Sequence, residues 1–433
     1  MASDEYIVKY TMVSYITWNN ERHFMEELYY RYNPWWENEF PLAGVIPRTG
    51  QLQLLENYLK QKTVVFITGL RRVGKSTLMK LLIKKMIEED AVKPEHIFYI
   101  SLDDYRLTRK TILEIVEEYR KVHSLSFKQK VYLFFDEVTF QKDYEQQLKN
   151  LFDSQNVKIF ASSSSASILK NKKPFLTGRS VFMEVMPLNF SEYLRFKNIM
   201  VPKSDVHLLD NHFENYLQTG GIPEFVLHND IEYLKELVDD IIRKDISSFY
   251  NVKNTQVLED FFLLLMERAG KQISINKTAN ILKISPDSAK RYLEMFADSY
   301  LIYLVPRYGK TNERLLSQKK VYAPDLGIRT LFTGFRDKGS LFENLVFLSI
   351  KQLEPSYVLQ DKIEIDFMTK KKELIEVKYH SELTEKQKAL FSSTQAKRKH
   401  IIKNYNDLEK FLLQKENEWF LHEEENFHLR KGW

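Results

Sequence analysis

Residues 63–77 read TVVFITGLRRVGKST, and this stretch decides the fold of the first half of the chain. Residues 63–68 form a short apolar run rich in β-branched side chains, which is typical of a buried parallel strand. A glycine-rich turn follows, and residues 76–89 then have the apolar periodicity of a helix. Residues 69–76 fit the pattern G-x-x-x-x-G-K-[ST] without a mismatch, which predicts a phosphate-binding loop (P-loop) between a strand and a helix.

The turn is predicted to bind ATP together with Mg²⁺. Its glycines let consecutive backbone N–H groups approach the phosphates, and the positive end of the following helix adds to the attraction. We expect the Lys75 ammonium to contact the β- and γ-phosphates, and the Ser76 hydroxyl to ligate Mg²⁺. Arg71 and Arg72 are expected to reach either phosphate or a partner. The residues predicted to bind the nucleotide are Gly69, Arg71, Arg72, Val73, Gly74, Lys75, Ser76 and Thr77.

A second apolar run, LFFDE at residues 133–137, ends in two acids. A buried strand that ends in Asp-Glu is what the second half of such a nucleotide site needs (a Walker B element). We expect Asp136 to hold the metal, directly or through water, and Glu137 to act as the general base on the attacking water. A strand that merely ends in surface acids is the plainer alternative, and the P-loop upstream argues against it.

Four serines at residues 162–165 follow an apolar run that ends at Ala161. Small hydroxyl side chains at the carboxyl end of a strand lie at the nucleotide crevice of such sheets. Ser162 or Ser163 is expected to orient the water or sense the γ-phosphate, with Ser163 as the catalytic candidate; a polar loop fits equally well. Arg179 is a further candidate, offering its guanidinium to the phosphates of its own or a neighbouring subunit, although a plain surface arginine also fits.

Strand-like and helical segments alternate through the first half of the chain. Besides residues 63–68, strand-like runs occur at 96–100, 131–135 and 157–161. This alternation predicts an α/β fold, a three-layer αβα parallel sheet of the P-loop NTPase type. From about residue 190 the pattern turns mostly helical, and from about residue 340 it becomes mixed α+β.

Composition narrows the class of protein. A chain of 433 residues predicts two to four domains. The absence of cysteine excludes disulfides and thiolate metal sites and fits a reducing compartment. The N-terminus lacks the layout of a signal peptide, and no apolar run is long enough to span a bilayer, so we expect a cytoplasmic protein without a membrane partner. The net charge of +5 permits nucleic acid as a partner, although a mixed solvated surface fits it too.

Several further motifs resemble a known family in their order and spacing. The chain resembles the prokaryotic AAA-type ATPases whose C-terminal half is a conserved domain of unknown function. The resemblance rests on residues 69–77 (GLRRVGKST), 134–137 (FFDE), 176–179 (LTGR), 186–193 (MPLNFSEY), 220–224 (GGIPE), 243–245 (RKD), 291–293 (RYL), 322–327 (YAPDLG) and 342–344 (FEN). The family usually has Gly-Ser after the strand that ends at Ala161, where this chain has only serines, so the identity of the sensor residue stays open.

The resemblance implies an AAA-like ATPase core, a winged-helix region and a C-terminal domain similar to restriction-endonuclease folds. Together with the sequence pattern it predicts the following division: an N-terminal lead-in segment at 1–45, the ATPase core at 46–190, a helical lid region at 191–270, a winged helix at 271–335 and a restriction-endonuclease-like domain at 336–433. The family supplies no settled biological role.

Residues 273–299 are typical of a helix-turn-helix. Ser285 is the predicted N-cap of the second helix and Pro286 fits its first turn. Lys290 and Arg291 project from this helix, where a DNA-reading helix carries its contacts. DNA is therefore a candidate partner, and a winged helix that serves only to pack domains is the alternative.

Asp366, Glu376 and Lys378 fit the pattern D…E-x-K on two adjacent strands, and Glu343 on a preceding helix could complete the set. In nucleases of this architecture the two carboxylates hold a divalent ion that activates water, and the lysine steadies hydroxide or phosphate charge. Glu376 and Lys378 are two apart on a strand, so they are expected to face the same side. An active nuclease and an inactive fold kept for binding fit this pattern equally well.

Two functional hypotheses follow. In the first, ATP hydrolysis switches a DNA-associated process, and the C-terminal domain adds metal-dependent nuclease activity. In the second, the chain is a nucleotide-gated signalling or scaffold protein with a catalytically inactive nuclease-like domain. A membrane-coupled ATPase is the least favoured, because no amphipathic anchor or hydrophobic span supports it. Whether the chain is a monomer or a homo-oligomer stays open.

Overall fold

The computed structural model describes residues 23–40, 42, 44–166, 176, 178–205 and 207–415 of the chain. These residues group into two units that divide between Val185 and Met186. The short segment Leu70–Val73, in the middle of the P-loop, groups with the second unit. The first 22 residues of the predicted lead-in, and the last 18 residues of the predicted C-terminal domain, lie outside the described residues.

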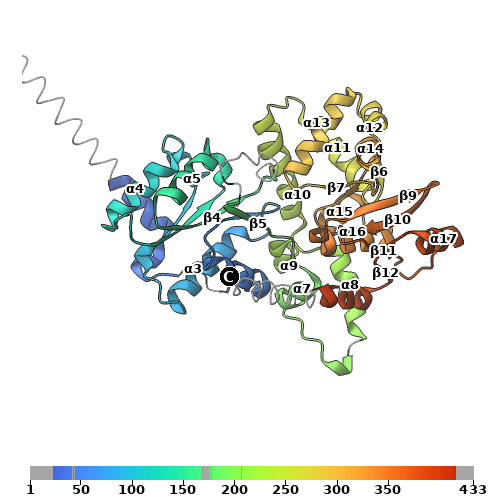
Figure 1. Ribbon diagram of the computed structural model, residues 1–433, viewed down its shortest axis with the longest axis horizontal. Helices are drawn as coiled ribbons and strands as arrows, with labels where there is room; N and C mark the ends of the chain where they lie inside the picture. The colour runs from blue at the N-terminus through green and yellow to red at the C-terminus, as the bar shows by residue number, and fades with distance from the viewer. Residues whose placement is uncertain are drawn as a thin grey trace, which may run out of the picture. The chain divides into compact units, whose positions relative to one another are not determined.

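The first unit is built on five strands that pair in the order β2-β3-β4-β1-β5, and every pairing is parallel. Figure 1 labels β4 and β5 of this sheet. The strands are β1 (Val64–Thr68), β2 (Ile97–Ser101), β3 (Val131–Asp136), β4 (Val157–Ser163) and β5 (Ser180–Glu184). This confirms the predicted α/β fold of the P-loop type and four of its strands. The sequence analysis missed β5. The order places β4 between the strand that leads into the P-loop and the strand that ends in Asp136.

Both faces of this sheet are buried, which explains why its strands are continuously apolar. Val64 and Phe66 belong to one core cluster, together with Tyr119 from a flanking helix. Successive strand residues point to opposite faces, and on the other face the rings of Phe134 and Phe160 stack with centroids 5.0 Å apart. The flanking α-helices are α2 (Thr49–Leu59), α3 (Lys75–Glu88), α4 (Ile112–Val122) and α5 (Tyr144–Ser154); the short 3-10 helices are η1 (Pro34–Glu37), η2 (Pro94–His96), η3 (Tyr105–Leu107) and η4 (Val138–Phe140).

The described part of the lead-in packs on this sheet. Residues 23–32 are helical, and the ring of Trp36 stacks near that of Phe98 with centroids 6.1 Å apart. Trp36 Nε1 also donates to the carbonyl oxygen of Ile97 at 3.0 Å. The aromatic residue Trp36 of the lead-in therefore extends the core beside β2.

The second unit begins with helices and ends with two small sheets. Its helices are α7 (Phe190–Phe196), η6 (Lys203–Asp205), α8 (Leu208–Thr219), α9 (Pro223–His228), α10 (Ile231–Asp240), the π-helix η7 (Ile241–Ser248), α11 (Thr255–Glu267), α12 (Ile275–Leu282), α13 (Pro286–Asp298), α14 (Thr311–Leu316), α15 (Leu326–Thr333), α16 (Lys338–Ile350), η8 (Lys351–Leu353) and α17 (Glu385–Ser393). Residues 405–415 are also helical. No helix in the described part of the chain combines the length and the apolar character needed to cross a bilayer.

The predicted helix-turn-helix is confirmed as α12 and α13. Ser285 caps α13, because its hydroxyl accepts from Ser288 N at 3.1 Å, and Pro286 is the first helical residue. Three short antiparallel strands accompany the helix pair in the order β6-β8-β7. They are β6 (Gln272–Ile273), β7 (Tyr303–Val305) and β8 (Lys319–Tyr322).

A four-stranded sheet in the order β12-β11-β10-β9 follows. Its strands are β9 (Ser356–Gln360), β10 (Ile363–Met368), β11 (Glu373–Val377) and β12 (Arg398–Ile402). β10 pairs antiparallel with both β9 and β11, whereas β11 and β12 run parallel. The two adjacent strands predicted to carry Asp366 and Glu376 are therefore confirmed as β10 and β11.

Asp325 is a buried carboxyl that joins two helices of the second unit. It caps α15, accepting from Ile328 N at 3.0 Å, and it also accepts from Gly221 N at 2.6 Å, just beyond the end of α8. Burial raises the pKa of Asp325 to about 6, and the backbone N–H donors hold it below the value that burial alone would give.

We expect Asp325→Asn to change how stability depends on pH. The pKa of Asp325 rises on folding, so its contribution to stability is complete below about pH 3 and is lost as the pH rises through about 6. One pKa unit corresponds to about 1.4 kcal/mol. The unfolding free energy of Asp325→Asn minus that of the wild type should therefore increase by about 3 kcal/mol between pH 3 and pH 7, on top of a constant loss from altered hydrogen bonds. Urea titrations followed by circular dichroism measure this difference, and an equal difference at both pH values would contradict the account.

Candidate functional site

The P-loop turns sharply where β1 ends. Gly69 has φ of +136°, and a Cβ atom there would lie only 2.3 Å from the carbonyl oxygen of Val185. Gly74 has φ of +96° and directly precedes α3. The side chain of Lys75 is buried, and its Nζ donates to the carbonyl oxygen of Gly69 at 3.0 Å, so the ammonium lies back across the loop. The loop thus has the backbone turn and the positive charge that a phosphate site requires.

The two acids of β3 are tied to β4 by a serine. Ser162 Oγ donates to Asp136 Oδ1 and accepts from the backbone N–H of Glu137 at 2.9 Å. Ser163 instead contacts Thr139 Oγ1 at 3.1 Å and accepts from Ser165 N at 3.0 Å. Of the two serines that the sequence left open, the structure therefore favours Ser162 as the one that orders the acids, although Ser163 had been named as catalytic.

Two residues that sequence reasoning missed also hold these acids. Ser164 donates to Glu137 Oε2 from both its backbone N and its Oγ, each at 3.0 Å. Glu137 has φ of +49° and ψ of +51°, a left-handed conformation that costs a non-glycine residue about 1–2 kcal/mol. Tyr99 OH donates to Asp136 Oδ2 at 2.6 Å. Only the strand order, which brings β2 beside β3, reveals Tyr99; its place in an apolar run gives no signal.

The same tyrosine lies close to both Asp136 and the P-loop serine. Burial and then the charge of Asp136 raise the pKa of Tyr99, whereas the nearby Ser76 hydroxyl lowers it. Ser76 and Asp136, the two predicted Mg²⁺ ligands, therefore both lie near the Tyr99 phenol. At the end of β1, Thr68 Oγ1 is buried and has no hydrogen-bond partner among the described residues. Hydroxyl and carboxylate oxygens are the ligands that Mg²⁺ prefers, so these residues fit a magnesium-bound nucleotide.

The remaining predicted nucleotide-binding residues differ in their surroundings. Val73 is fully buried, so only its backbone faces the turn, and Thr77 lies in the first turn of α3. Within the second unit, with which Leu70–Val73 group, Arg71 Nη2 lies 2.7 Å from Asp245 Oδ1 and Arg72 Nη2 lies 3.4 Å from Asp240 Oδ2. Both arginines are thus paired with carboxylates, which they would have to exchange for phosphate.

Arg179 lies at the end of the sheet opposite the P-loop, so it cannot contact the nucleotide of its own chain. It precedes β5, and its carbonyl oxygen accepts from Val64 N at 2.8 Å, so it is level with the start of β1. The P-loop follows the other end of β1. The guanidinium pairs with Asp153, whose Oδ2 lies 2.8 Å from Arg179 Nη1. The in-chain role predicted for Arg179 is corrected on this ground, and a role toward a neighbouring subunit stays a prediction.

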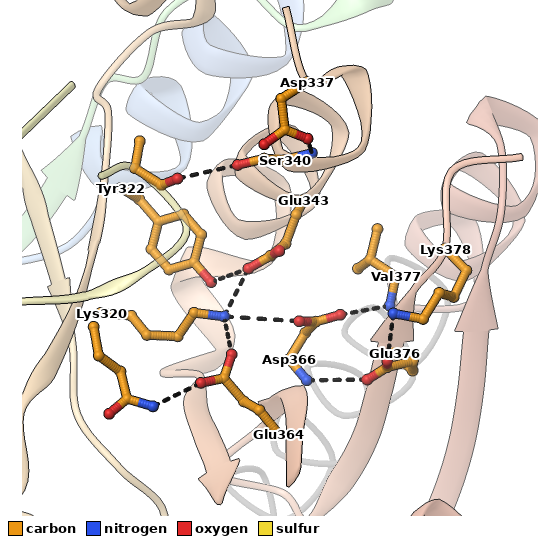
Figure 2. A network of polar contacts seen from close by, with 12 residues as sticks. Lys320, Tyr322, Asp337, Ser340, Glu343, Glu364, Asp366, Glu376, Val377 and Lys378 are labelled. Carbon is orange, nitrogen blue, oxygen red and sulfur yellow. Dashed lines mark hydrogen bonds and ion pairs between the residues drawn. The ribbon is translucent and has the colours of Figure 1, made fainter. Parts of the chain in front are cut away.

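The C-terminal residues that the sequence selected do converge in the second unit (Figure 2). Asp366 N donates to Glu376 Oε2 at 3.2 Å, and Asp366 Oδ2 accepts from Val377 N at 2.9 Å. Lys378 Nζ lies 2.9 Å from Glu376 Oε1, which confirms that these two side chains face the same side. Burial and the charge of Glu343 raise the pKa of Asp366, and burial raises that of Glu376.

Sequence reasoning missed a lysine at the centre of this network. Lys320 on β8 is buried, and its Nζ lies 2.8 Å from Glu343 Oε1, 2.7 Å from Glu364 Oε1 and 3.7 Å from Asp366 Oδ1 (Figure 2). Burial alone would lower the pKa of Lys320, but these carboxylates raise it well above the ordinary value, so the ammonium stays charged. Tyr322 OH donates to Glu343 Oε1 at 2.7 Å.

These surroundings do not fit the divalent ion predicted at Asp366 and Glu376. Among the residues that the structure describes, no group of three or more His, Asp or Glu side chains is arranged to hold a metal ion. An ammonium group already lies among Glu343, Glu364 and Asp366, and a second one lies against Glu376. The metal role of Asp366 and Glu376 therefore stays a prediction, which these surroundings do not favour.

Comparison with known families gives two matches along the chain. Residues 61–194 match the family model described as an AAA domain, and residues 210–339 match one described as a domain of unknown function, DUF8612. The AAA match confirms the predicted type of the first unit. Neither match supports the predicted restriction-endonuclease-like domain.

Whole-chain relatives also exist. A Methanocaldococcus jannaschii protein, described as uncharacterized protein MJ1544, is 32% identical over 388 residues, which cover 84% of this chain and 84% of that protein. An uncharacterized protein of Haemophilus influenzae is 26% identical over 346 residues, which cover 76% of this chain and 84% of its own length.

Two solved structures overlap with the chain in part. The Walker-type ATPase of Pyrococcus abyssi has a TM-score of 0.41 and 14% identity, and the match covers 68% of this chain and 98% of that one. The ORC2 protein of Aeropyrum pernix has a TM-score of 0.41 and 13% identity, with coverage of 71% and 96%.

We expect Gly69→Ala to destabilise the first unit. The new methyl group would meet the Val185 carbonyl at 2.3 Å and would hold the backbone at a φ that disfavours a side chain. Strain and overpacking together should cost about 2–4 kcal/mol. Gly50→Ala is the matched control, because a Cβ there has nothing within 4 Å and lies in α2, where alanine is favoured. Thermal unfolding should separate the two variants by several degrees, and a Gly69→Ala protein as stable as Gly50→Ala would contradict the close approach.

Proposed function

The chain belongs to the family of the Methanocaldococcus jannaschii protein MJ1544, and from this premise and the AAA match we propose that it hydrolyses ATP with Mg²⁺ and works as a nucleotide switch. The observation that carries the proposal is the network at the carboxyl ends of β1, β3 and β4. There Ser162 orders both acids of β3, and Tyr99 donates to Asp136.

Each residue of this network has a role in the proposed hydrolysis. The loop N–H groups and Lys75 bind the phosphates and gather their negative charge. Glu137 accepts a proton from the attacking water, whose oxygen bonds to the γ-phosphorus as the bond from that phosphorus to the bridging oxygen breaks. The products are ADP and inorganic phosphate. Ser164 holds Glu137 Oε2 and so orients the carboxylate before water arrives. Mg²⁺, when bound at Ser76 and Asp136, supplies charge stabilisation of the phosphates.

Two substitutions should separate binding from hydrolysis. Lys75→Ala removes the ammonium, so we expect the affinity for ATP to fall about 10- to 100-fold. Glu137→Gln keeps an acceptor for Ser164 but cannot take a proton, so it should bind ATP normally while kcat falls about 10²- to 10⁴-fold. Binding of a fluorescent ATP analogue and release of phosphate give the two readouts. If Glu137→Gln turned over at the wild-type rate, Glu137 would not be the base.

We propose nucleic acid as the partner that the switch acts on. The specific observation is the helix pair α12–α13, on and beside which four basic side chains are exposed: Lys277, Lys283, Lys290 and Arg291. Basic residues on a second helix of this kind are placed to contact phosphates and base edges. Asp287 and Glu294 on α13 are also exposed, so any contact must use the basic side of the helix.

The double variant Lys290→Ala/Arg291→Ala tests this surface. We expect its affinity for duplex DNA to fall about 10-fold, and the slope of log affinity against log salt to decrease by about 2, because two phosphate contacts are lost. Lys370→Ala/Lys371→Ala removes the same charge from the exposed turn between β10 and β11 and serves as the control. Fluorescence anisotropy with labelled duplex and single strands gives the affinities. Equal effects in both double variants, or no binding by the wild type, would leave the scaffold hypothesis in place of the DNA-associated one.

A further inference from the structure

The cluster around Lys320 joins three elements of the second unit. Lys320 comes from β8, Glu343 from α16, and Glu364 and Asp366 from β10 (Figure 2). Gln272 on β6 also reaches it, because its Nε2 donates to Glu364 Oε2 at 2.8 Å. Lys320 thus projects from the three-stranded sheet into the carboxylates of the four-stranded sheet, in the region where the sequence predicted a metal.

The oxygens that a metal would need already accept hydrogen bonds or ion pairs. Glu364 contacts Lys320 through Oε1 and Gln272 through Oε2. Asp366 contacts Lys320 through Oδ1 and Val377 N through Oδ2. Glu376 contacts Lys378 through Oε1 and Asp366 N through Oε2. Each of these oxygens keeps a second lone pair, but a divalent ion that used those of Glu343, Glu364 or Asp366 would have to lie beside the Lys320 ammonium.

The position of the ammonium makes such binding unfavourable. Lys320 is only 1% exposed, so it has no path to solvent while β8 stays in place. A metal ion bound to these carboxylates lies within a few ångströms of their oxygens and would therefore face the ammonium at short range. Two like charges at that distance in a poorly solvated interior repel strongly, and a lysine ammonium offers three donors to the acceptors around it.

We propose that Lys320 is the resident cation of this cluster, filling the place of a divalent ion, so that the four-stranded sheet does not carry out metal-dependent hydrolysis. The carboxylates Glu343, Glu364 and Asp366 serve to hold the two sheets of the second unit together through one buried ammonium. This inference does not depend on ATP hydrolysis, because its test uses no nucleotide.

The test measures Mn²⁺ binding to the full chain without nucleotide, by titration calorimetry and by electron paramagnetic resonance. The wild type and Asp366→Asn should bind Mn²⁺ identically, because Asp366 takes no metal. Lys320→Met, which keeps the length of the side chain and removes its charge, should gain one Mn²⁺ site with at least 10-fold tighter binding than the wild type, and Lys320→Met/Asp366→Asn should lose it. Lys378→Met is the matched control, since it removes the other ammonium of the network, and it should gain no site.

Two results would overturn the proposal. One is Mn²⁺ binding by the wild type that is lost in Asp366→Asn. Cleavage of plasmid DNA that requires Mn²⁺ and is lost in Asp366→Asn would overturn the proposal equally. The other is a Lys320→Met protein with wild-type circular dichroism that gains no Mn²⁺ site. If Lys320→Met does not fold, the comparison of the wild type with Asp366→Asn decides the question by itself.

Discussion

The position of β4 between β1 and β3 is the constraint on which the first unit depends. The P-loop leaves the end of β1, and Asp136 and Glu137 leave the end of β3, so the two halves of the site are separated by one strand. The end of β4 must therefore carry small polar side chains that can form hydrogen bonds to the neighbouring strand. Ser162 does so by contacting Asp136 and the Glu137 amide together. An apolar side chain at this position would remove one of the two hydroxyl donors to the buried Asp136 carboxylate, which costs free energy.

Each unit manages its buried charge in a different way. In the first unit, hydroxyl groups from Tyr99, Ser162 and Ser164 donate to the acids and add no positive charge. Because these donors are neutral, they do not compete with a cation that is brought in with the nucleotide. In the second unit, Lys320 supplies a full positive charge to the carboxylates around it. The acids of the first unit are therefore suited to binding a metal ion, whereas the carboxylates of the second unit already have a cation in Lys320. Acidic residues in the two units therefore lead to different proposals.

Signals between residues close in sequence allowed most of the fold of the first unit to be predicted. The P-loop, the strand before it and the helix after it are contiguous, so residues 63–89 could be predicted correctly from pattern alone. The capped start of α13 at Ser285 could be predicted for the same reason. β5 was missed because five half-buried residues, SVFME, give neither a continuous apolar run nor a clear alternation.

Contacts between distant residues could not be predicted, because they depend on strand order and direction. Tyr99 and Asp136 are 37 positions apart and meet only because β2 pairs with β3. Arg179 was a candidate for contact with the phosphates because the sequence does not tell at which end of the parallel strands a residue lies. Lys320 was overlooked because a lysine in a short strand is usually solvent-exposed, and nothing in its neighbourhood of the sequence signals burial.

The most direct test of the central claim is a crystal structure of the chain soaked or grown with Mg²⁺ and a non-hydrolysable ATP analogue. The account predicts density for the phosphates along the backbone of residues 69–76, with the Lys75 ammonium on the β- and γ-phosphates and a magnesium ion between Ser76 and Asp136. A nucleotide bound elsewhere, or a P-loop that stays empty at saturating analogue while the protein is folded, would contradict it.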